Sequence, residues 1–385
     1  MIAEHSHGRW AMIRRPYIII QSDDIKSRLW REAAEHEGVD IVMASGSPMY
    51  MPVHLLRNVR KRGIPKALVF RYLNDYRPLW RTMLRAASEA STLMLCALLG
   101  VRVIWICHNV DRESALNHPW ISRLRRLMIG KRAAAVLVTD QHLVEFAREH
   151  LLPRPKVVGY VTFGEYIRRS DAREAEEFTE LVRSAVGEWK QKDPRAIVGL
   201  CAGSPSWKMA HYAFVPDLIR AAESVGLQIR MIVAGPVEEF LQRNAPGVLR
   251  FFQTDGRVRF RSGYVPIKEH DIASYIDFYW KVYSDYSVPM SIYAAASVGR
   301  PVLTLNMGFL GLMVRKYQLG EVIERDFSNI ASAFAALSEW DPRHAREFLH
   351  ANSWTCGAKS LIVASGLSGM RLPEALPALS GDDVR

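Results

Sequence analysis

The sequence predicts an α/β protein made of two Rossmann-like domains that face each other across a cleft. Short β-branched or apolar runs alternate with helical stretches along both halves of the chain, which is the pattern of parallel sheets covered by helices. The chain has 385 residues, more than the roughly 100–200 residues of one domain. Its composition, 49% hydrophobic and 24% charged, is that of a folded globular protein and excludes large-scale disorder.

The first half is expected to contain five strands. They lie at residues 17–21, 40–43, 67–72, 101–107 and 134–138. The first of them ends in a polar cluster that contains Asp23 and Asp24, and a helix over residues 28–36 follows. Residues 91–107 are apolar over a length that approaches a membrane span, but a glycine and an arginine divide them. We therefore expect a helix followed by a buried strand there.

The second half repeats the alternation. Its strands are expected at residues 196–201, 228–234, 258–260, 278–282 and 302–305, and its last helices at residues 330–338 and 348–363. Residues 170–194 are dense in Glu, Arg and Lys and end in an Asp-Pro pair, so we place the interdomain linker there. This gives an N-terminal domain over residues 1–180 and a C-terminal domain over 181–350. Residues 351–385 form a C-terminal helix, with a return to the N-terminal domain as one option, and a frayed tail.

Charge and cysteine content narrow the classes of partner. Fifty-one Lys and Arg against 40 Asp and Glu leave a net charge of +11, which attracts phosphates in nucleic acid, anionic lipid or a nucleotide-bearing substrate. No module for nucleic-acid recognition is present, so that class is set aside. The four cysteines have no CxxC spacing, and no metal-ligand spacing is found, so we expect no metal and no cofactor. The cysteine pattern and the N-terminus, which lacks a signal-peptide core, fit a cytoplasmic protein.

Three segments carry a family resemblance. They are IYAAASVGRPVLTLN at residues 292–306, AGSPSWK at residues 202–208, and LLGVRVIWICHNV at residues 98–110. Together they resemble the nucleotide-sugar-dependent glycosyltransferases of the GT-B fold, in particular the retaining family 4 group that contains many bacterial exopolysaccharide enzymes. The resemblance implies an N-terminal acceptor domain and a C-terminal donor domain, with the substrates bound between them.

The implied function is the transfer of a sugar from a GDP- or UDP-sugar to a glycan acceptor linked to a polyprenyl diphosphate, in bacterial polysaccharide assembly. The enzyme would then be cytoplasmic and peripheral at the inner face of the plasma membrane. Two alternatives stay open. One is a glycosyltransferase that acts on a soluble small molecule, and the other is an inactive protein that binds a sugar nucleotide or a membrane surface.

The sequence departs from the family at one central position. The family's two glutamates, eight residues apart, would fall at Tyr286 and Ala294 by alignment from Gly299, and neither residue is acidic. The sequence, with Ser287 and Ser291, is more similar to the enzymes whose version of this helix contains serine and is rich in Ala and Leu. The choice between retention and inversion of the anomeric centre therefore stays open.

The candidate donor-binding residues follow strands of the second half. They are Gly203, Ser204, Lys208, Tyr264, Tyr286, Ser287 and Ser291. Backbone N–H groups of the turn after residue 202, with the charge of Lys208, would hold a diphosphate, and the start of a helix after Ser287 would supply further donors. Tyr264 would stack on the base. The alternatives are an ordinary turn, an N-cap at Ser287 and simple packing of Tyr264.

The candidate catalytic residues lie in the first half. His108 ends an apolar strand, where a titratable group is awkward to bury, and Asn109 beside it would contact the acceptor or the sugar. Asp23 and Asp24 end the first strand and would serve as general base in an inverting reaction. The alternatives are a structural histidine and aspartates that only cap a helix.

A basic stretch is the candidate membrane contact. Residues 57–62 and 123–132 are rich in Arg and Lys, and the second stretch also holds Leu124 and Leu127 and follows Trp120. At helical spacing this combination predicts an amphipathic basic face suited to an anionic bilayer. The alternative is a solvated helix whose apolar side packs in the core.

Overall fold

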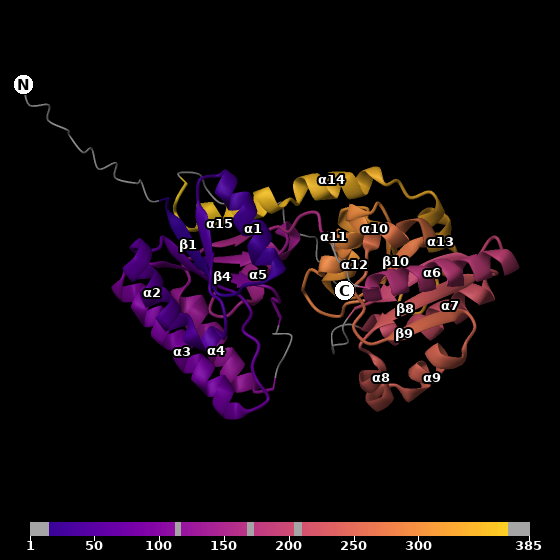
Figure 1. Ribbon diagram of the computed structural model, residues 1–385, viewed down its shortest axis with the longest axis horizontal. Coiled ribbons are helices and arrows are strands. Elements are labelled where there is room, and N and C mark those ends of the chain that lie inside the picture. The colour runs from indigo at the N-terminus through magenta and orange to yellow at the C-terminus, as the bar shows by residue number, and fades with distance from the viewer. Residues whose placement is uncertain (1–14, 112–116, 168–172, 204–209, 369–385) are drawn as a thin grey trace, which may run out of the picture.

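The computed structural model describes residues 15–111, 117–167, 173–203 and 210–368, and it confirms the predicted fold class. Two six-stranded sheets, in which every paired strand is parallel, form separate α/β domains (Figure 1). Among the described residues no helix is both long and apolar enough to cross a membrane. The expected helix and strand around residues 91–107 are confirmed, because a helix ends at Leu98 and a buried strand begins at Arg102.

The N-terminal sheet has the strand order β2-β1-β3-β4-β5-β6. Its elements are β1 (Tyr17–Ile20), α1 (Ile25–His36), β2 (Asp40–Met43), η1 (Pro48–Tyr50), α2 (Met51–Arg62), β3 (Ala67–Phe70), α3 (Leu79–Leu98), β4 (Arg102–Cys107), α4 (Pro119–Arg132), β5 (Ala135–Val138), η2 (Gln141–Leu143), α5 (Val144–His150) and β6 (Val158–Tyr160). The central strands β1, β3 and β5 are buried along their whole length, as expected for β-branched and apolar runs covered on both faces.

The C-terminal sheet has the order β12-β11-β10-β7-β8-β9. Its elements are α6 (Arg173–Lys192), β7 (Ile197–Ala202), η3 (Ala210–Tyr212), α7 (Val215–Ser224), β8 (Ile229–Gly235), α8 (Glu238–Asn244), α9 (Pro246–Thr254), β9 (Val258–Ser262), α10 (Glu269–Ile272), η4 (Ala273–Tyr275), β10 (Phe278–Trp280), α11 (Met290–Ser297), β11 (Val302–Leu305), α12 (Gly308–Lys316), β12 (Gly320–Ile323) and α13 (Ile330–Ser338). The strand order reverses between β7 and β10, and ligands of such sheets bind at this reversal, beyond the carboxyl ends of the strands.

The segment expected to be a linker is a helix of the C-terminal domain. Helix α6 buries Phe178, Val182 and Trp189, which repeat at helical spacing, and the Trp189 indole donates to the carbonyl of Gly256 at 3.0 Å. The placement of a linker at residues 170–194 was therefore wrong, because the charged residues that suggested it lie only on the solvent face of this helix.

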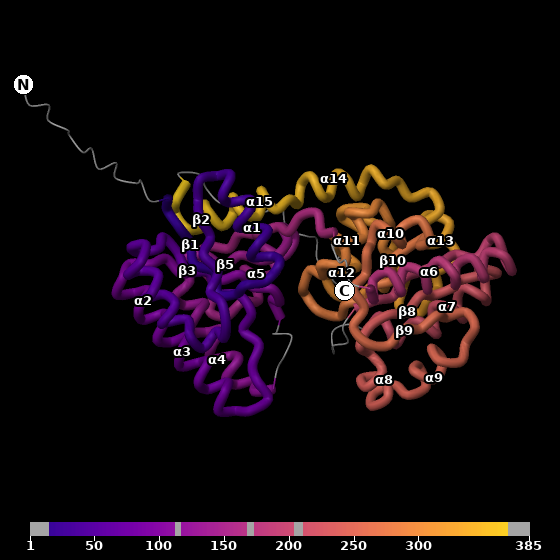
Figure 2. The backbone as a smooth tube through the Cα atoms, in the orientation of Figure 1, coloured from indigo at the N-terminus to yellow at the C-terminus, as the bar shows by residue number. Residues whose placement is uncertain are grey.

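The last helical stretch is two helices, not one. α14 (Arg343–Ala351) packs on α11 of the C-terminal domain, and α15 (Trp354–Ala364) packs on α1 of the N-terminal domain (Figure 2). Ser353 breaks the stretch, because it is the N-cap of α15 and its hydroxyl accepts from the Cys356 N–H at 3.2 Å. The chain thus returns to the first domain in α15.

Loops at the carboxyl edges of the two sheets contact each other. Phe146 of α5 stacks on Tyr286, which follows β10, with ring centroids 4.0 Å apart and planes 7° from parallel. The Tyr317 hydroxyl donates to Asp140 at 3.0 Å, and the Val110 N–H donates to the Tyr286 carbonyl at 3.4 Å. The two carboxyl edges therefore face each other.

Candidate functional site

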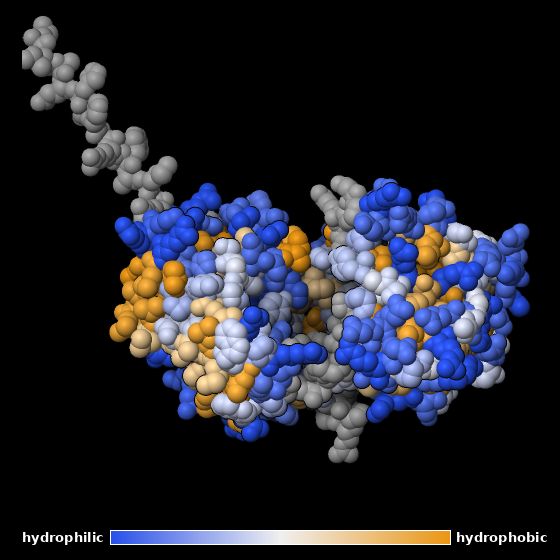
Figure 3. Space-filling model, turned by 60° about the horizontal axis from the view of Figure 1, so that its bottom comes forward, coloured by the Kyte–Doolittle hydropathy of each residue, from blue (hydrophilic) through white to orange (hydrophobic). Residues whose placement is uncertain are grey.

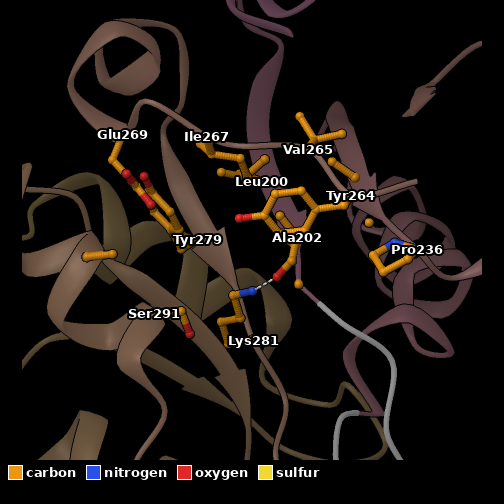
Figure 4. A pocket seen from close by; sticks show the side chains of 14 residues that line it. Leu200, Ala202, Pro236, Tyr264, Val265, Ile267, Glu269, Tyr279, Lys281 and Ser291 are labelled. Atoms are coloured by element: carbon orange, nitrogen blue, oxygen red, sulfur yellow. Dashed lines mark hydrogen bonds between the residues drawn. The ribbon is translucent and has the colours of Figure 1, made fainter. Parts of the chain in front are cut away.

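A pocket of about 110 Å³ lies at the carboxyl ends of β7, β8 and β10 in the C-terminal domain. Figure 4 shows the side chains that line it. They are Leu200, Ala202, Gly203, Ala234, Gly235, Pro236, Tyr264, Val265, Ile267, Glu269, Tyr279, Lys281, Ser291 and Ala294. Apolar strand residues form the floor, while the polar groups come from the strand ends, the β9–α10 loop and α11. The pocket is thus a mostly apolar cavity with a few convergent polar groups, which is typical of small-molecule sites.

Two glycines bring the ends of β7 and β8 together. Gly203 and Gly235 have φ angles of +142° and +147°, which other residues rarely adopt. A Cβ at Gly235 would lie 2.2 Å from the Gly203 carbonyl oxygen, so no side chain fits there. The Tyr212 hydroxyl fixes this approach, since it donates to the Gly203 carbonyl at 2.6 Å. The backbone is therefore exposed to the pocket without side chains in front of it.

Lys281 places a cation beside this glycine turn. Its side chain is almost completely buried, and the ammonium donates to the Ala202 carbonyl (Figure 4). An ammonium has three N–H donors, and a Cβ at Gly203 would lie 3.6 Å from this nitrogen. Burial, and then the charge of Lys281, lowers the pKa of His211 well below its usual range, so that neighbour stays neutral. Lys281 therefore brings positive charge to the floor of the pocket.

Helix α11 forms one wall. The hydroxyl oxygen of Ser291 is buried and has no hydrogen-bond partner within the described part of the chain. The residue before the helix is Pro289, which offers no side-chain cap, so the first N–H groups of α11 also lack a capping side chain. Ala294 lies one turn further along and is buried against the pocket. The small residue there leaves space that a glutamate would fill.

The other wall carries Tyr264 and Glu269. The Tyr264 ring is 75% exposed, so it has room to move against a bound molecule. The Glu269 carboxylate is buried, and Figure 4 shows its side chain and that of Tyr279 pointing toward one another. The pocket therefore has an acidic end at Glu269 and a basic end at Lys281.

Not every predicted donor residue lies in the pocket lining. Gly203, Tyr264 and Ser291 do, whereas Ser204 and Lys208 fall outside the described residues. Tyr286 is instead part of the interdomain contact with Phe146. The hydroxyl of Ser287 donates to the two carboxylate oxygens of Asp285, at 2.9 Å each.

The proposed N-cap at Ser287 was wrong. Helix α11 begins at Met290 with Pro289 as its N-cap, because Pro289 already has the extended backbone that precedes a first turn. The hydroxyl of Ser287 is also bonded to a buried carboxylate of its own loop.

Arg71 organises the facing edge of the N-terminal sheet. Its buried guanidinium donates to the hydroxyls of Ser22 at 2.8 Å and Ser27 at 2.6 Å, and to the Asp24 carboxylate at 2.8 Å. Asp24 is also the N-cap of α1, because it accepts from the Ser27 N–H at 2.9 Å. Burial acts to raise the pKa of Asp24, but the nearby Arg71 charge holds that pKa below its usual range. The capping alternative is therefore confirmed for Asp24.

Asp23 lies outside this network. Its carboxylate is a third exposed and pairs with Arg28 at 2.8 Å. It is the N-cap of no described helix.

His108 lies at the same edge of the sheet. Its ring stacks on Tyr72 with centroids 4.4 Å apart, and its Nε2 accepts from the Arg71 Nε at 3.4 Å. Neighbouring Asn109 is 98% buried, and its carbonyl accepts from Arg126 at 3.2 Å. Burial raises the pKa of the Tyr72 phenol to about 12, so that ring stays neutral. His108 is thus half-buried within a fixed aromatic and cationic cluster.

Helix α4 presents only part of the basic face that the sequence predicted. Arg125 is fully buried and forms a bidentate ion pair with Glu89, at 2.6 and 2.7 Å. Arg126 is half-buried, and it donates to the Val110 carbonyl at 2.7 Å. These two arginines were wrongly assigned to the surface, because a buried carboxylate on α3 and backbone carbonyls after β4 accept their hydrogen bonds. Arg123, Lys131 and Arg132 remain exposed.

Comparison with known proteins rests on structure alone, since no family model and no curated protein matches the chain. The structure is similar to sucrose-phosphate synthase from Thermosynechococcus elongatus, with a TM-score of 0.61 and 16% identity over 90% of this chain and 97% of that one. It is also similar to a glycosyltransferase from Rickettsia africae ESF-5, with a TM-score of 0.61 and 11% identity over 92% of this chain and 100% of that one.

A third similar structure is WaaG, a glycosyltransferase involved in lipopolysaccharide biosynthesis. The TM-score is 0.52 at 14% identity, over 92% of this chain and 100% of WaaG. All three matches include both domains and almost the whole length of each relative. The chain has the GT-B fold. In this GT-B chain the pocket belongs to the C-terminal domain, and the His108 cluster belongs to the N-terminal domain.

Sequence reasoning missed three charged residues of the GT-B cleft: Arg71, Lys281 and Glu269. Both basic residues directly follow a buried strand, and the expected strands at residues 67–72 and 278–282 included them. A charged residue at the end of an apolar run was the available signal. Glu269 starts a four-residue helix, and no local pattern marks it as buried.

Proposed function

We propose that this chain is a glycosyltransferase that moves a sugar from a nucleotide-diphosphate donor to a glycan acceptor. One observation carries the proposal. A buried lysine and a side-chain-free glycine turn meet in a pocket at the carboxyl edge of the C-terminal sheet, where the strand order reverses. This combination suits a diphosphate, because the exposed backbone accepts close approach and the lysine balances negative charge.

The leaving group of sugar transfer is the nucleoside diphosphate, which gains negative charge as the bond between the anomeric carbon of the sugar and the phosphate oxygen breaks. In the proposed arrangement, Lys281 and the uncapped N–H groups of α11 stabilise that charge. The Ser291 hydroxyl, which has no partner in the described protein, supplies a hydrogen bond to phosphate or ribose. These groups are already fixed before the reaction, so little reorganisation opposes it.

The nucleoside would occupy the other half of the pocket. Tyr264 is placed to cover the base, and Glu269 offers carboxylate oxygens to ribose hydroxyls or base N–H groups. Both GDP- and UDP-sugars fit these chemical features.

The acceptor would bind on the N-terminal side of the cleft. His108, held between Tyr72 and Arg71, is the proposed contact to the transferred sugar or to the acceptor hydroxyl. Of the two aspartates, Asp23 is the better candidate for general base in an inverting reaction, because Arg71 lowers the pKa of Asp24, which makes that carboxylate a weaker base, and Asp24 also caps α1. Neighbouring Asn109 is the other proposed contact to the acceptor or the sugar.

The proposed acceptor is a glycan linked to a polyprenyl diphosphate, in polysaccharide assembly of the exopolysaccharide type at the inner face of the plasma membrane. The basic composition and the resemblance to family 4 enzymes support this choice. A soluble small-molecule acceptor is the alternative within the same activity.

A second candidate function is sugar-nucleotide binding without transfer. Tyr286 and Ala294 favour it, since they stand where related enzymes carry glutamates and neither can handle a proton or bind a ribose as a carboxylate does. A thermal-shift panel of UDP, GDP, ADP and their sugars tests both candidates first, because a ligand at a hundred times its Kd adds about 2.7 kcal/mol of stability. Nucleotide release in the presence of acceptor lipid then separates them: transfer predicts release, and binding alone predicts none.

A further inference from the structure

Helix α3 exposes an apolar stripe along its whole length. Trp80, Met83, Leu84, Met94 and Leu98 are all at least half exposed. With the exposed residues Ala87, Ala90, Ser91 and Ala97 between them, they lie on one side of the helix, where an exposed residue recurs every three or four positions at 80, 84, 87, 91, 94 and 98. Twenty residues of helix are about 30 Å long, so this is a continuous surface and not a set of scattered side chains.

The buried face of the same helix is polar from Thr82 to Thr92, before Leu93 and Cys96 join the hydrophobic core near its end. Thr82, Arg85, Ser88, Glu89 and Thr92 point into the protein. Glu89 joins Arg85 of its own helix to Arg125 of α4 at 3.1 and 2.6 Å, and Arg85 donates to the Asn74 carbonyl at 2.8 Å. These bonds fix the orientation of α3. From Thr82 to Thr92 the helix therefore reverses the arrangement of an ordinary surface helix, whose apolar side faces the core.

Neighbouring elements extend the stripe into a broader surface. Helix α3 packs on η1 and α2 on one side and on α4 on the other. Their exposed apolar residues are Tyr50, Val53, Leu56, Trp120 and Leu124. We call the exposed surface of η1, α2, α3 and α4 the α2–α4 face. Figure 3 shows hydrophobic side chains gathered on the outer surface of the N-terminal domain.

The charge of the α2–α4 face has a single sign. Its exposed basic residues are Arg57, Arg60, Lys61, Arg62, Arg81, Arg123, Lys131 and Arg132. Glu89 is the only acidic residue in these four elements, and it is buried. An isologous contact with a second copy would place this positive surface against itself and cost energy. An anionic bilayer matches this face, because its acyl chains suit the apolar side chains and its headgroups suit the basic residues around them.

We propose that the α2–α4 face docks on an anionic membrane, with α3 lying in the plane of the interface and its apolar stripe among the acyl chains. Trp80 and Trp120 stand at the first turns of helices that follow β3 and β4, so they lie at the carboxyl edge of the sheet. A bilayer on this face therefore reaches the cleft edge. Membrane docking would present a lipid-linked substrate beside His108. It rests on the proposed function, because that function supplies the lipid-linked acceptor.

Vesicle sedimentation of the full chain tests the docking. Vesicles that mix phosphatidylglycerol with phosphatidylcholine should bind the protein, and pure phosphatidylcholine vesicles should bind it about tenfold more weakly or worse. The double variant Leu84→Glu/Met94→Glu should lose about tenfold or more in partitioning, and Arg57→Glu/Arg60→Glu should show a similar loss that disappears at high salt. Val225→Glu, at an exposed apolar position of the C-terminal domain, is the matched control and should bind as the parent does.

Three results would overturn the proposal. They are binding that ignores lipid charge, binding unchanged by Leu84→Glu/Met94→Glu, and a concentration-dependent dimer that these substitutions dissolve in the absence of vesicle binding. Capture of an acidic protein with no vesicle binding would likewise count against it. The stripe variants should keep their melting temperature and their affinity for GDP or UDP, so failure of the docking and failure of the donor site can be told apart.

Discussion

The carboxylate of Asp140 in the N-terminal domain accepts a hydrogen bond of 3.0 Å from the Tyr317 hydroxyl in the C-terminal domain. Asp140 is buried and Tyr317 is partly buried at the interdomain contact, where Gln141 also donates to the Tyr317 oxygen at 3.1 Å. Burial raises the pKa of Asp140 to about 7, against partial opposition from the bonds to His142 N–H and Tyr317. The contact between the domains therefore contains a carboxyl group that titrates near neutrality.

Asp140 predicts a pH dependence of stability. In the folded state the Asp140 carboxyl keeps its proton up to about pH 7, whereas in the unfolded chain it loses the proton near pH 4. The protonated carboxyl therefore contributes its full stabilisation below about pH 4, and this contribution is lost as the pH rises through 7. Asp140→Asn should remove that loss, which amounts to a few kcal/mol at roughly 1.4 kcal/mol per unit of pKa shift. Urea unfolding at pH 4.5 and 7.5 measures it. The surface variant Asp217→Asn should keep the parent's slope, and a slope also kept by Asp140→Asn would refute the assignment.

Ser291→Ala should separate binding from stability. Its hydroxyl has no partner among the described residues, so removing it should leave the melting temperature unchanged or raise it. The same change should weaken nucleotide-diphosphate binding by about 0.5–1.5 kcal/mol, the usual range for one hydrogen bond. Ser297→Ala on the same helix is the control, because its hydroxyl bonds Tyr293 and Tyr166 and not the pocket. Loss of stability without loss of affinity in Ser291→Ala would remove this residue from the site.

His108→Ala should lower turnover far more than it lowers the melting temperature. The side chain is half-buried and its bond to Arg71 is long at 3.4 Å, so the fold loses little. Initial rates of nucleotide release and a thermal melt are compared with those of the exposed His150→Ala control. A collapse of folding with His108→Ala would instead support the structural histidine that the sequence left open.

Glu89→Ala should be severely destabilising. Its removal would leave the buried guanidinium groups of Arg85 and Arg125 without their carboxylate, which costs about 3–5 kcal/mol for a buried pair. Glu145→Ala breaks an ion pair with Arg148 that is partly exposed, and should cost under about 1 kcal/mol. Urea unfolding of both variants provides the comparison, and equal costs would contradict the inverted packing of α3.

The fold could be predicted because its main signals are local. Strands β2 and β11 were expected at their observed bounds, since β-branched and apolar runs between polar turns specify a strand. β6 and β12 were missed because they are short and contain glycine. Helix α6 was missed because the charged residues of its solvent face dominated the composition of the segment. Its apolar face packs on the C-terminal domain, and that contact is not visible in the composition.

The site could be predicted only in part, because only some of its residues are positioned by local sequence signals. Gly203, Tyr264 and Ser291 follow strands or begin a helix, so their positions at the carboxyl edge follow from topology. The direction of Arg125 depends on Glu89, 36 residues earlier in the chain, and that of Tyr286 depends on Phe146 in the other domain. Such pairings are set by tertiary packing, which periodicity does not encode.

Calorimetric titration of the parent and of Lys281→Met with GDP and UDP tests the central claim most directly. Methionine keeps the volume of the buried chain but removes the cation beside Gly203, so affinity for a nucleotide diphosphate should fall by about 1.5–3 kcal/mol, the range for a hydrogen bond to a charged group. Lys192→Met, on the exposed face of α6, should leave the affinity unchanged. Tight binding of GDP or UDP by the parent, lost in Lys281→Met alone, is the predicted result. Two results would contradict the placement of a nucleotide-sugar donor in this pocket. One is that the parent binds neither nucleotide, and the other is that Lys281→Met binds GDP and UDP as tightly as the parent does.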